Sequence, residues 1–493
     1  MISALAAWIE RRPGAAFAAF AALHAAVWTA LPTALYKNLP LDLIEALTYG
    51  REWQLGYDKL PPLPWWLVEI AHRLFETDLA FYALSEIVIV ATFAILFAAA
   101  RPLVGAVGAL VAVLIVDGLH YFNYTAPKFN HDVMQLPFWA LAGLAFRSGL
   151  RRGRLIDWLL LGVALGLALW AKYFVVVLAV PLALFLLVDR DARRVLATPG
   201  PWVALAAALA VMAPHLVWLV RNDFLPFAYA SARALPSHGA LDHLVHPLVF
   251  ALSQAGALAP ALAIALPLRW PPRAERVVKP DDFDRRIVTL LAFGPAATVI
   301  VLSLVTGRGL VAMWGYPLWL FIGLWLVMAS GAVVDRVRLG RIAGLWAIVF
   351  IGLAGAFVVN YAVLPAIDHR YRAAFFPGDR MAAEVAQRFR TATGTPLRYV
   401  IASMWVGGNV AHYAAERPRV LIDGNPRRAP WIDLADLKAH GAAVVWVVGD
   451  RASVPADYRA VVPDARVGTP FTLPARNGVG DVEVGWAILP PEK

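Results

Sequence analysis

The sequence predicts a polytopic α-helical membrane protein with about 11 transmembrane helices and a small C-terminal α/β domain. Composition carries the first part of this prediction, because 60% of the 493 residues are hydrophobic and only 16% are charged. Soluble domains average about 25% charged residues. After Pro365 the long apolar runs stop, and charged residues, Gly and Pro return in soluble-like proportions. We therefore expect a membrane domain over residues 1–365 and a soluble domain over 366–493.

Apolar runs along the first part of the chain approach the roughly 20 residues that cross a bilayer as a helix. We predict spans at about 14–36, 79–100, 103–121, 132–148, 155–171, 173–188, 200–220, 247–267, 288–306, 311–331 and 342–363. The fifth and sixth are short, and only Lys172 separates them. The first run is long and lacks a clean cleavage site, which favours a retained span over a signal peptide.

The distribution of basic residues predicts the orientation of these spans. With the N-terminus in the cytoplasm, the inside loops hold about 19 Lys and Arg residues and the outside loops about nine, the bias expected of cytoplasmic loops. Residues 37–75 and the C-terminal domain then lie on the periplasmic side of a bacterial inner membrane. The same bias accounts for the net charge of +10. No basic–aromatic nucleic-acid motif accompanies it, so we expect the lipid bilayer, and no nucleic acid, as a partner.

The C-terminal segment alternates between strand-like and helix-like patterns, which is typical of an α/β domain. Short buried strands are predicted at Leu397–Ala402, Arg419–Ile422 and Ala442–Val448, and helices at 379–390, 405–416 and 431–440. Cysteine is absent, which excludes disulfides and thiolate metal sites. Phosphate-binding loops, zinc-protease motifs and serine nucleophile elbows are also missing from the sequence.

A polar island at residues 37–75 follows the first predicted span. Pro40 and the Pro61–Pro62 pair delimit two amphipathic segments, Leu41–Tyr49 and Leu63–Phe75, which we expect to lie as helices along the outer membrane surface. Asp42 and Glu45 are three residues apart and share a helix face. An ordinary alternative is that these acids only complement the helix dipole. Glu45, Tyr57 and Trp65 are expected to shape a pocket, whereas Arg51, Glu52 and Glu69 are expected to face water.

Other polar residues collect near the predicted outer ends of the spans. The candidates for substrate contact are Lys128, His131, Asp132, Lys172, Tyr173 and Arg308. An N-cap role is the alternative for Asp132, and snorkelling to the interface is the alternative for Lys172. Carboxylates can take a proton from a hydroxyl, Lys and Arg can hold phosphate, and aromatic rings can stack on sugars. Such a set of side chains outside a membrane suits a lipid-linked sugar phosphate.

Three motifs resemble the GT-C superfamily of membrane glycosyltransferases, specifically glycosyltransferase family 39. They are the Asp-led LDLIEAL after the first span, the Lys59-Leu60-Pro61-Pro62-Leu63 element followed by PWWL, and LGLALWAKYFVVVLAVPLALFLL with its Ala-Lys-Tyr at 171–173. The likeness covers about residues 1–330 and points to the bacterial branch related to the lipid A aminoarabinose transferase and the protein O-mannosyltransferases.

The resemblance implies an inverting hexosyl- or pentosyltransferase that uses a polyprenyl-phosphate-linked sugar donor at the periplasmic face. The acceptor it implies is lipid A, lipopolysaccharide or another envelope glycolipid, or a protein. By motif, Asp42 takes the place of the catalytic acid, Lys59 that of the lysine on the lipid phosphate, and Asp132 that of a second acid. The family often has Asp and Glu adjacent, whereas here Leu43 follows Asp42 and the next acid is Glu45.

The sequence leaves open a cofactor and two alternative functions. A divalent cation could bridge acid and phosphate, but the sequence has no diagnostic ligand set. A transporter or lipid flippase would have charged residues at mid-span and inverted repeats, and the sequence suggests neither. A scaffold whose outer domain captures a partner is a third reading.

Overall fold

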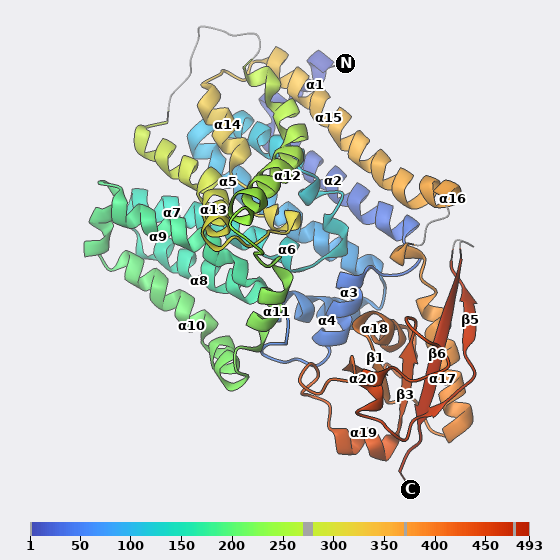
Figure 1. Ribbon diagram of the computed structural model, residues 1–493. Coiled ribbons are helices and arrows are strands. Elements are labelled where there is room, and N and C mark those ends of the chain that lie inside the picture. Colours follow the sequence, from blue (N-terminus) through green and yellow to red (C-terminus); the bar gives the residue numbers. More distant parts are fainter. Residues whose placement is uncertain (1, 270–279, 369–371, 477–479, 493) are drawn as a thin grey trace. The chain divides into compact units, whose positions relative to one another are not determined.

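The computed structural model describes residues 2–269, 280–368, 372–476 and 480–492 (Figure 1). The chain forms two compact units. The helical unit consists of Met1–Ala30, Lys59–Pro61 and Tyr82–Ala356. The α/β unit consists of Leu31–Asp58, Pro62–Phe81 and Phe357–Lys493, so it takes in the polar island except for a three-residue segment at Lys59–Pro61.

The helical unit is built from apolar helices rich in Ala, Leu and Val. They are α1 (Ile2–Arg11), α2 (Pro13–Leu35), α5 (Leu79–Asp117), α6 (His131–Met134), α7 (Leu136–Arg152), α8 (Leu155–Ala171), α9 (Val176–Val188), α10 (Gly200–Arg221), α11 (Leu225–Arg233), α12 (Asp242–Ala265), α13 (Asp282–Thr306), α14 (Ile322–Ser330) and α15 (Arg336–Val358). Some helices at the unit's boundaries continue into the α/β unit. Within the described ranges, six helices are long and apolar enough to cross a membrane.

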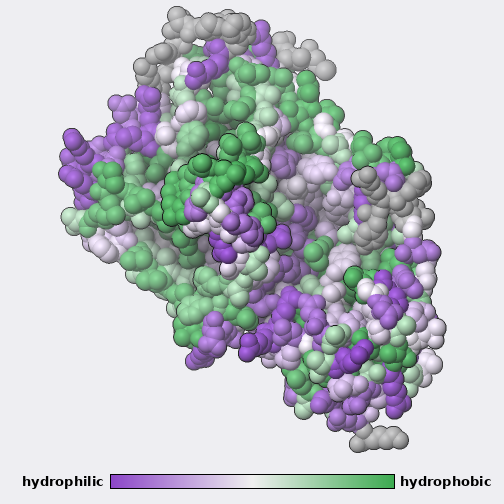
Figure 2. All heavy atoms as spheres, viewed as in Figure 1, coloured by the Kyte–Doolittle hydropathy of each residue, from purple (hydrophilic) through white to green (hydrophobic). Residues whose placement is uncertain are grey.

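The outer surface of the helical unit is apolar, as a lipid-facing surface must be. Trp202, Leu209 and Val220 on α10 and Leu248 and Leu252 on α12 are large exposed hydrophobic side chains. Figure 2 shows hydrophobic surface over much of this unit. A soluble protein would not leave so many large apolar side chains in water, and the fold is that of a polytopic membrane protein.

Some predicted spans differ from the observed helices. The spans predicted at 79–100 and 103–121 correspond to the two halves of α5, which is interrupted by a kink where Gly105 has a non-helical φ of 72°. The segment predicted at 311–331 is helical only over α14 and a short 3₁₀ turn at Ala312–Gly315. Hydrophobicity marked this last segment as buried, but it could not distinguish an irregular buried stretch from a complete helical span.

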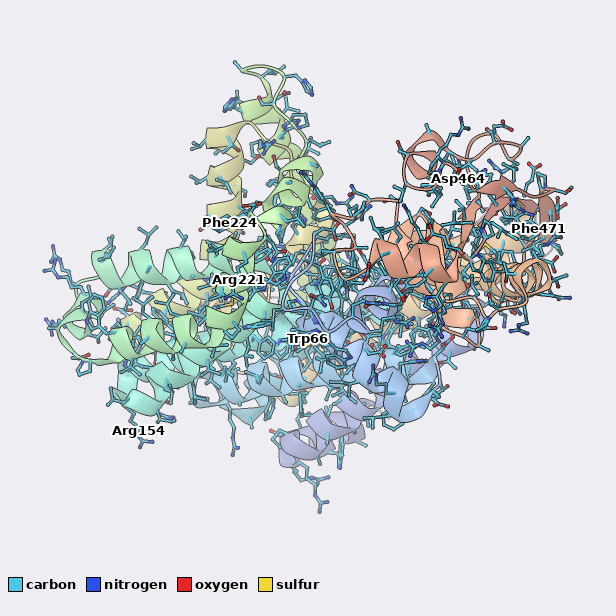
Figure 3. The ribbon with its side chains drawn as sticks, turned by 90° about the horizontal axis from the view of Figure 1, so that it is seen from below. Trp66, Arg154, Arg221, Phe224, Asp464 and Phe471 are labelled. Atoms are coloured by element: carbon cyan, nitrogen blue, oxygen red, sulfur yellow. The ribbon has the colours of Figure 1, made fainter. Side chains whose placement is uncertain are left out.

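Helices α8 and α10 pack side by side and in parallel through small residues. A Cβ placed on Gly162 would lie 2.2 Å from the Ala204 carbonyl oxygen, and one on Gly166 would lie 2.7 Å from Val211 Cβ. Glycine therefore permits a close backbone approach, as small residues commonly do between membrane helices. Arg154 and Arg221 mark the opposite ends of this helix pair (Figure 3).

A buried charged cluster lies inside the helical unit and was not predicted. His24 of α2 lies between two carboxylates of α5, with Nε2 3.1 Å from Glu86 Oε2 and Nδ1 3.0 Å from Asp117 Oδ1. All three side chains are almost fully buried. Trp346 of α15 donates its indole N–H to the second Asp117 oxygen at 2.7 Å. The cluster ties α2 to both halves of α5 and to α15, and it shows that ionisable groups do not collect only at one membrane face.

We predict that His24→Ala lowers the thermal unfolding temperature of the detergent-purified protein strongly, because it leaves two buried carboxylates without their cation. Breaking a buried ion pair costs about 3–5 kcal/mol. The matched control is His238→Ala, since His238 is an exposed histidine of the same unit and its hydrogen bond to Asp242 comes from its backbone N–H. Equal unfolding temperatures for the two variants would show that the cluster does not stabilise the bundle.

The α/β unit contains a six-stranded sheet in the order β2-β1-β3-β6-β4, with β5 paired to β6 (Figure 1). Its strands are β1 (Tyr399–Ala402), β2 (Arg419–Ile422), β3 (Ala442–Trp446), β4 (Arg466–Val467), β5 (Phe471–Pro474) and β6 (Asp481–Leu489). The three strands predicted from the sequence are the parallel ones, β1, β2 and β3. The antiparallel strands that complete the sheet were not predicted.

Helices cover both faces of this sheet, and each face has its own hydrophobic cluster. The helices of the C-terminal segment are α17 (Gly378–Thr393), α18 (Met404–Tyr413), α19 (Leu434–His440) and α20 (Ala456–Arg459). Helices α17 and α18 contribute to one cluster, while α19 and α20 contribute to the other. Ser403 and Asp433 cap α18 and α19 by accepting backbone N–H groups.

The two helices of the polar island, α3 (Leu41–Gly50) and α4 (Leu63–Phe75), pack within this unit. Helix α3 lies directly on α18, since a Cβ on Gly408 would come within 2.5 Å of Ile44. Ion pairs join the island to the arginines near β2: Arg419 to Glu52 at 2.5 Å, and Arg417 to Glu69 at 3.1 Å.

The expectation that Arg51, Glu52 and Glu69 only face water is therefore wrong. Arg51 donates to the carbonyl oxygens of Arg417 and Pro418, and the Glu69 side chain is completely buried. The sequence shows these residues as polar and local, whereas their partners lie more than 300 residues further along the chain.

Candidate active site

The candidate site in the helical unit begins in the loop between α5 and α6, which carries several polar residues. Two hydrogen bonds hold this loop in place. Asn123 Nδ2 donates to the Asp117 carbonyl oxygen at 2.6 Å, and Ser85 Oγ donates to the Ala126 carbonyl oxygen at 2.6 Å. Because Ser85 and Asp117 adjoin or belong to the buried cluster on α5, the charged core of the bundle also fixes the loop that leads to Asp132.

Asp132 and Lys172 form an ion pair at the end of the loop. Lys172 Nζ lies 2.5 Å from Asp132 Oδ1, with both side chains nearly buried at 12% and 11% exposure. Gln135 Nε2 also donates to Asp132 Oδ1, at 3.2 Å. The N-cap of α6 is Asn130, whose side-chain oxygen accepts the backbone N–H groups of Asp132 and Val133. The alternative that Asp132 serves as the N-cap is therefore wrong.

Lys172 is placed by a break in the chain between α8 and the 3₁₀ turn at Tyr173–Val175. Its backbone is extended, with φ −162° and ψ 135°, so the side chain leaves the direction of the preceding helix. Its ammonium group also lies 5.7 Å from the centre of the Phe174 ring. Lys172 is a directed cation with a specific carboxylate partner, which simple snorkelling into the interface does not explain.

His131 connects this pair to the Lys59–Pro61 segment. Its Nε2 lies 3.0 Å from the Pro61 carbonyl oxygen, so that nitrogen carries the proton and donates it. Burial lowers the pKa of His131 well below 6.5, and the nearby cations Lys172 and Lys59 lower the pKa further. The imidazole is therefore neutral at physiological pH. The charges of Lys172 and Lys59 both disfavour its protonation.

Helix α11 gathers three of the other predicted residues. Lys59 Nζ lies 5.2 Å from the centre of the Tyr229 ring, and Arg308 Nη1 donates to Ser231 Oγ at 3.2 Å. The Tyr173 ring stacks on Phe227 at 5.6 Å between centroids. The hydroxyl of Tyr173 pairs with His215 Nε2 at 2.7 Å. Sequence reasoning missed α11, although its aromatic residues follow closely after Arg221, the last residue of α10, and Phe224, both labelled in Figure 3.

The predicted residues of the α/β unit occupy different environments. Asp42 is partly exposed in the first turn of α3, while Glu45 is buried on the same helix. Tyr57 is buried, and its hydroxyl donates to the Tyr49 carbonyl oxygen at 2.7 Å. Its ring packs against Trp65 and Trp431. Tyr57 therefore forms part of the core of the α/β unit, where the island packs against the C-terminal segment.

The remaining candidates add no metal centre. Lys128 is partly exposed at the end of the short 3₁₀ turn Ala126–Lys128. Among the described residues, no cluster of three His, Asp or Glu side chains is arranged to hold a metal ion. The cations of the site are instead supplied by lysine and arginine side chains.

The loop between α5 and α6, the chain break at Lys172 and helix α11 thus gather lysines, an arginine, a carboxylate and aromatic rings in the apolar helical unit. Lysine and arginine side chains are the groups that commonly bind phosphate in proteins. Comparison with known proteins shows a family likeness over part of the chain. Residues 59–218 match the protein family described as dolichyl-phosphate-mannose-protein mannosyltransferase. This segment contains Lys59, His131, Asp132, Lys172 and Tyr173.

Two solved structures share the fold over nearly the whole chain. The crystal structure of ArnT from Cupriavidus metallidurans bound to undecaprenyl phosphate has a TM-score of 0.65 at 14% identity, covering 97% of this chain and 99% of that one. ArnT from the same organism in the apo state has a TM-score of 0.62 at 15% identity, covering 99% of this chain and 100% of that one. No curated protein sequence matches the chain. Residues 59–218 thus resemble the mannosyltransferase family, and the chain as a whole has the fold of ArnT.

The neutral state of His131 predicts a pH dependence of stability. Its pKa in the folded protein lies well below 6.5, so the unfolded chain binds the proton more readily as the pH falls. The contribution of His131 to stability is thus present above about pH 6.5 and is lost below it, by up to about 1.4 kcal/mol per pH unit.

The test compares wild type with His131→Gln, which keeps an N–H donor for Pro61 but does not titrate. Thermal unfolding midpoints are measured from about pH 7.5 to about pH 5. The wild type should lose more stability than the variant over this range, while other titrating groups contribute equally to both. Parallel pH profiles would contradict the burial of a neutral imidazole.

Proposed function

We propose that the protein transfers a sugar from a polyprenyl-phosphate donor to an acceptor hydroxyl at the periplasmic face of a bacterial inner membrane. The observation that carries this proposal is the grouping of Lys59, Lys172, His131 and Asp132 within the segment that matches the mannosyltransferase family. The undecaprenyl phosphate bound to a structure of the same fold supports this class of lipid. The orientation rests on the excess of basic residues in the loops that we place in the cytoplasm.

The reaction replaces one bond to the anomeric carbon by another. The acceptor oxygen attacks C1 of the sugar, the bond from C1 to the phosphate oxygen breaks, and polyprenyl phosphate leaves with the bonding electrons. Attack on the face opposite the phosphate inverts the configuration at C1. Because a phosphate ester is already an activated leaving group, the reaction needs no nucleotide.

The cations of the helical unit take the role of stabilising the leaving phosphate. The Lys59 ammonium group lies over the Tyr229 ring, and Arg308 donates to the neutral Ser231 hydroxyl. Lys172 is already paired with Asp132, so it sets the local charge and geometry. Negative charge that develops on the phosphate oxygens as the bond breaks is favoured by preorganised cations.

Asp42 takes the role of general base in this proposal. It is partly exposed, so an acceptor can approach its carboxylate, whereas Glu45 three residues later is buried. Glu45 therefore has a structural role in the packing of α3. Asp42 would take the proton of the acceptor hydroxyl as the new glycosidic bond forms. The proposed acceptor is an envelope glycolipid such as lipid A.

We predict that Asp42→Asn lowers the rate of sugar transfer by about 100-fold or more, because the amide cannot accept the proton. Binding of the donor should change little. Transfer is measured with a radiolabelled undecaprenyl-phosphate sugar and lipid A in proteoliposomes. Asp481→Asn is the control, since Asp481 is an exposed acid at the start of β6. Transfer by Asp42→Asn at the rate of this control would exclude Asp42 as the base.

A transporter or lipid flippase is the second candidate, and the buried cluster of His24, Glu86 and Asp117 is the observation that favours it. Ionisable residues inside a bundle are common in transporters. Here, however, the histidine bridges both acids and the three side chains are sealed from solvent, which suits an anchor between helices. Movement of lipid-linked sugar across proteoliposomes without any glycosidic bond change would favour the transporter.

A further inference from the structure

A pocket lies in the α/β unit. It encloses about 400 Å³ and is lined by the end of α2, the start of α3 and the segment that follows α15. Its volume falls within the range of small-molecule sites, about 300–1,000 Å³. Tyr36, Leu41, Asn360, Tyr361 and Arg372 are among its walls.

A turn of π-helix at Val359–Val363 supplies two of these residues. The π-turn connects α15 to α16 (Leu364–Asp368). Both Asn360 and Tyr361 line the pocket. Such turns interrupt the regular helix and frequently occur at functional sites. Successive residues of a regular α-helix are rotated by about 100° around its axis. The wider π-turn changes this rotation and therefore changes which side chains line the pocket.

The chemistry of the walls fits a carbohydrate. Tyr36 and Tyr361 meet edge to face with their ring centroids 4.8 Å apart, which makes an aromatic corner. Within the described parts of the chain, neither the Asn360 amide nor the Tyr361 hydroxyl has a hydrogen-bond partner, so both can serve a ligand. A sugar ring has an apolar face and polar hydroxyl groups. Aromatic rings can contact the apolar face, and amide and hydroxyl groups can form hydrogen bonds with the sugar hydroxyls.

Other occupants fit less well. A purely apolar lipid tail would bury the amide and the hydroxyl without hydrogen bonds, which is costly. A simple anion would meet Arg372 already engaged by both carboxylate oxygens of Asp368, at 3.0 and 2.8 Å. This ion pair presents a neutral, hydrogen-bonding wall, and such a wall suits hydroxyl groups better than a free phosphate.

The pocket adjoins the proposed general base along the chain. Leu41 lines the pocket, and Asp42 is the next residue, in the first turn of the same helix. We propose that this pocket binds a sugar ring of the acceptor, so that the acceptor is a glycolipid recognised through its carbohydrate. The inference rests on the proposed glycosyl transfer and assigns a subsite to its second substrate.

The experiment measures transfer from undecaprenyl-phosphate sugar to lipid A, with the acceptor and donor concentrations varied separately. Tyr361→Ala and Asn360→Ala should each raise the KM for lipid A about tenfold, the effect of losing one ring or amide contact, with the donor KM unchanged. Tyr361→Phe keeps the ring and should recover most of the acceptor affinity. Val359→Ala is the matched control, because Val359 lies on the same π-turn and does not line the pocket.

The outcomes separate this inference from the proposed function. If wild type transfers sugar to lipid A and the pocket variants have the acceptor KM of Val359→Ala, the pocket does not bind the acceptor. A change in donor KM alone would likewise overturn the inference, because the pocket would then serve the donor. If wild type transfers sugar only to Ser- or Thr-containing peptides, the transfer reaction stands but a glycolipid acceptor is wrong. If wild type transfers sugar to no acceptor, the proposed function itself fails.

Discussion

The ion pair between Asp132 and Lys172 is the interaction on which the candidate site depends. Lys172 interrupts an apolar stretch, and a charged side chain in such surroundings needs a partner. Asp132 supplies it at 2.5 Å, and neither side chain is more than about one-eighth exposed. The pair therefore fixes the chain break after α8 against the short helix α6. Removing either partner would leave a nearly buried charge, at a cost of about 3–5 kcal/mol.

The same requirement for partnered charge operates deeper in the helical unit. His24 between Glu86 and Asp117 joins α2, α5 and α15. Asp117 also holds Asn123 through its carbonyl oxygen, and Ser85 holds Ala126. The site loop is thus anchored by the core of the bundle at one end and by Asp132 at the other. In the α/β unit, Arg417, Arg419 and Arg428 hold Glu69, Glu52 and Asp58 of the island, so these acids organise the unit.

The sequence predicted the features that depend on local composition and spacing. Apolar runs predicted the polytopic helical class, and Pro40 and Pro62 delimited α3 and α4. The strands β1, β2 and β3 were predicted because they are short, apolar and buried on both faces. Features that depend on distant partners were missed: the charged cluster around His24, the antiparallel strand β6, and the arginines that bind Glu52 and Glu69. A single sequence shows that a charge is present in an apolar region but does not show which residue compensates it.

Lys59, beside His131 and the Asp132–Lys172 pair, is the residue that we propose binds the phosphate of a polyprenyl lipid. The most direct test is the affinity of the purified protein in nanodiscs for undecaprenyl phosphate. Lys59→Met should weaken binding about tenfold or more, since it removes a charge-assisted contact to phosphate. Lys438→Met is the control, because Lys438 lies on α19 in the α/β unit. Equal affinity of Lys59→Met, the control and wild type would contradict the claim.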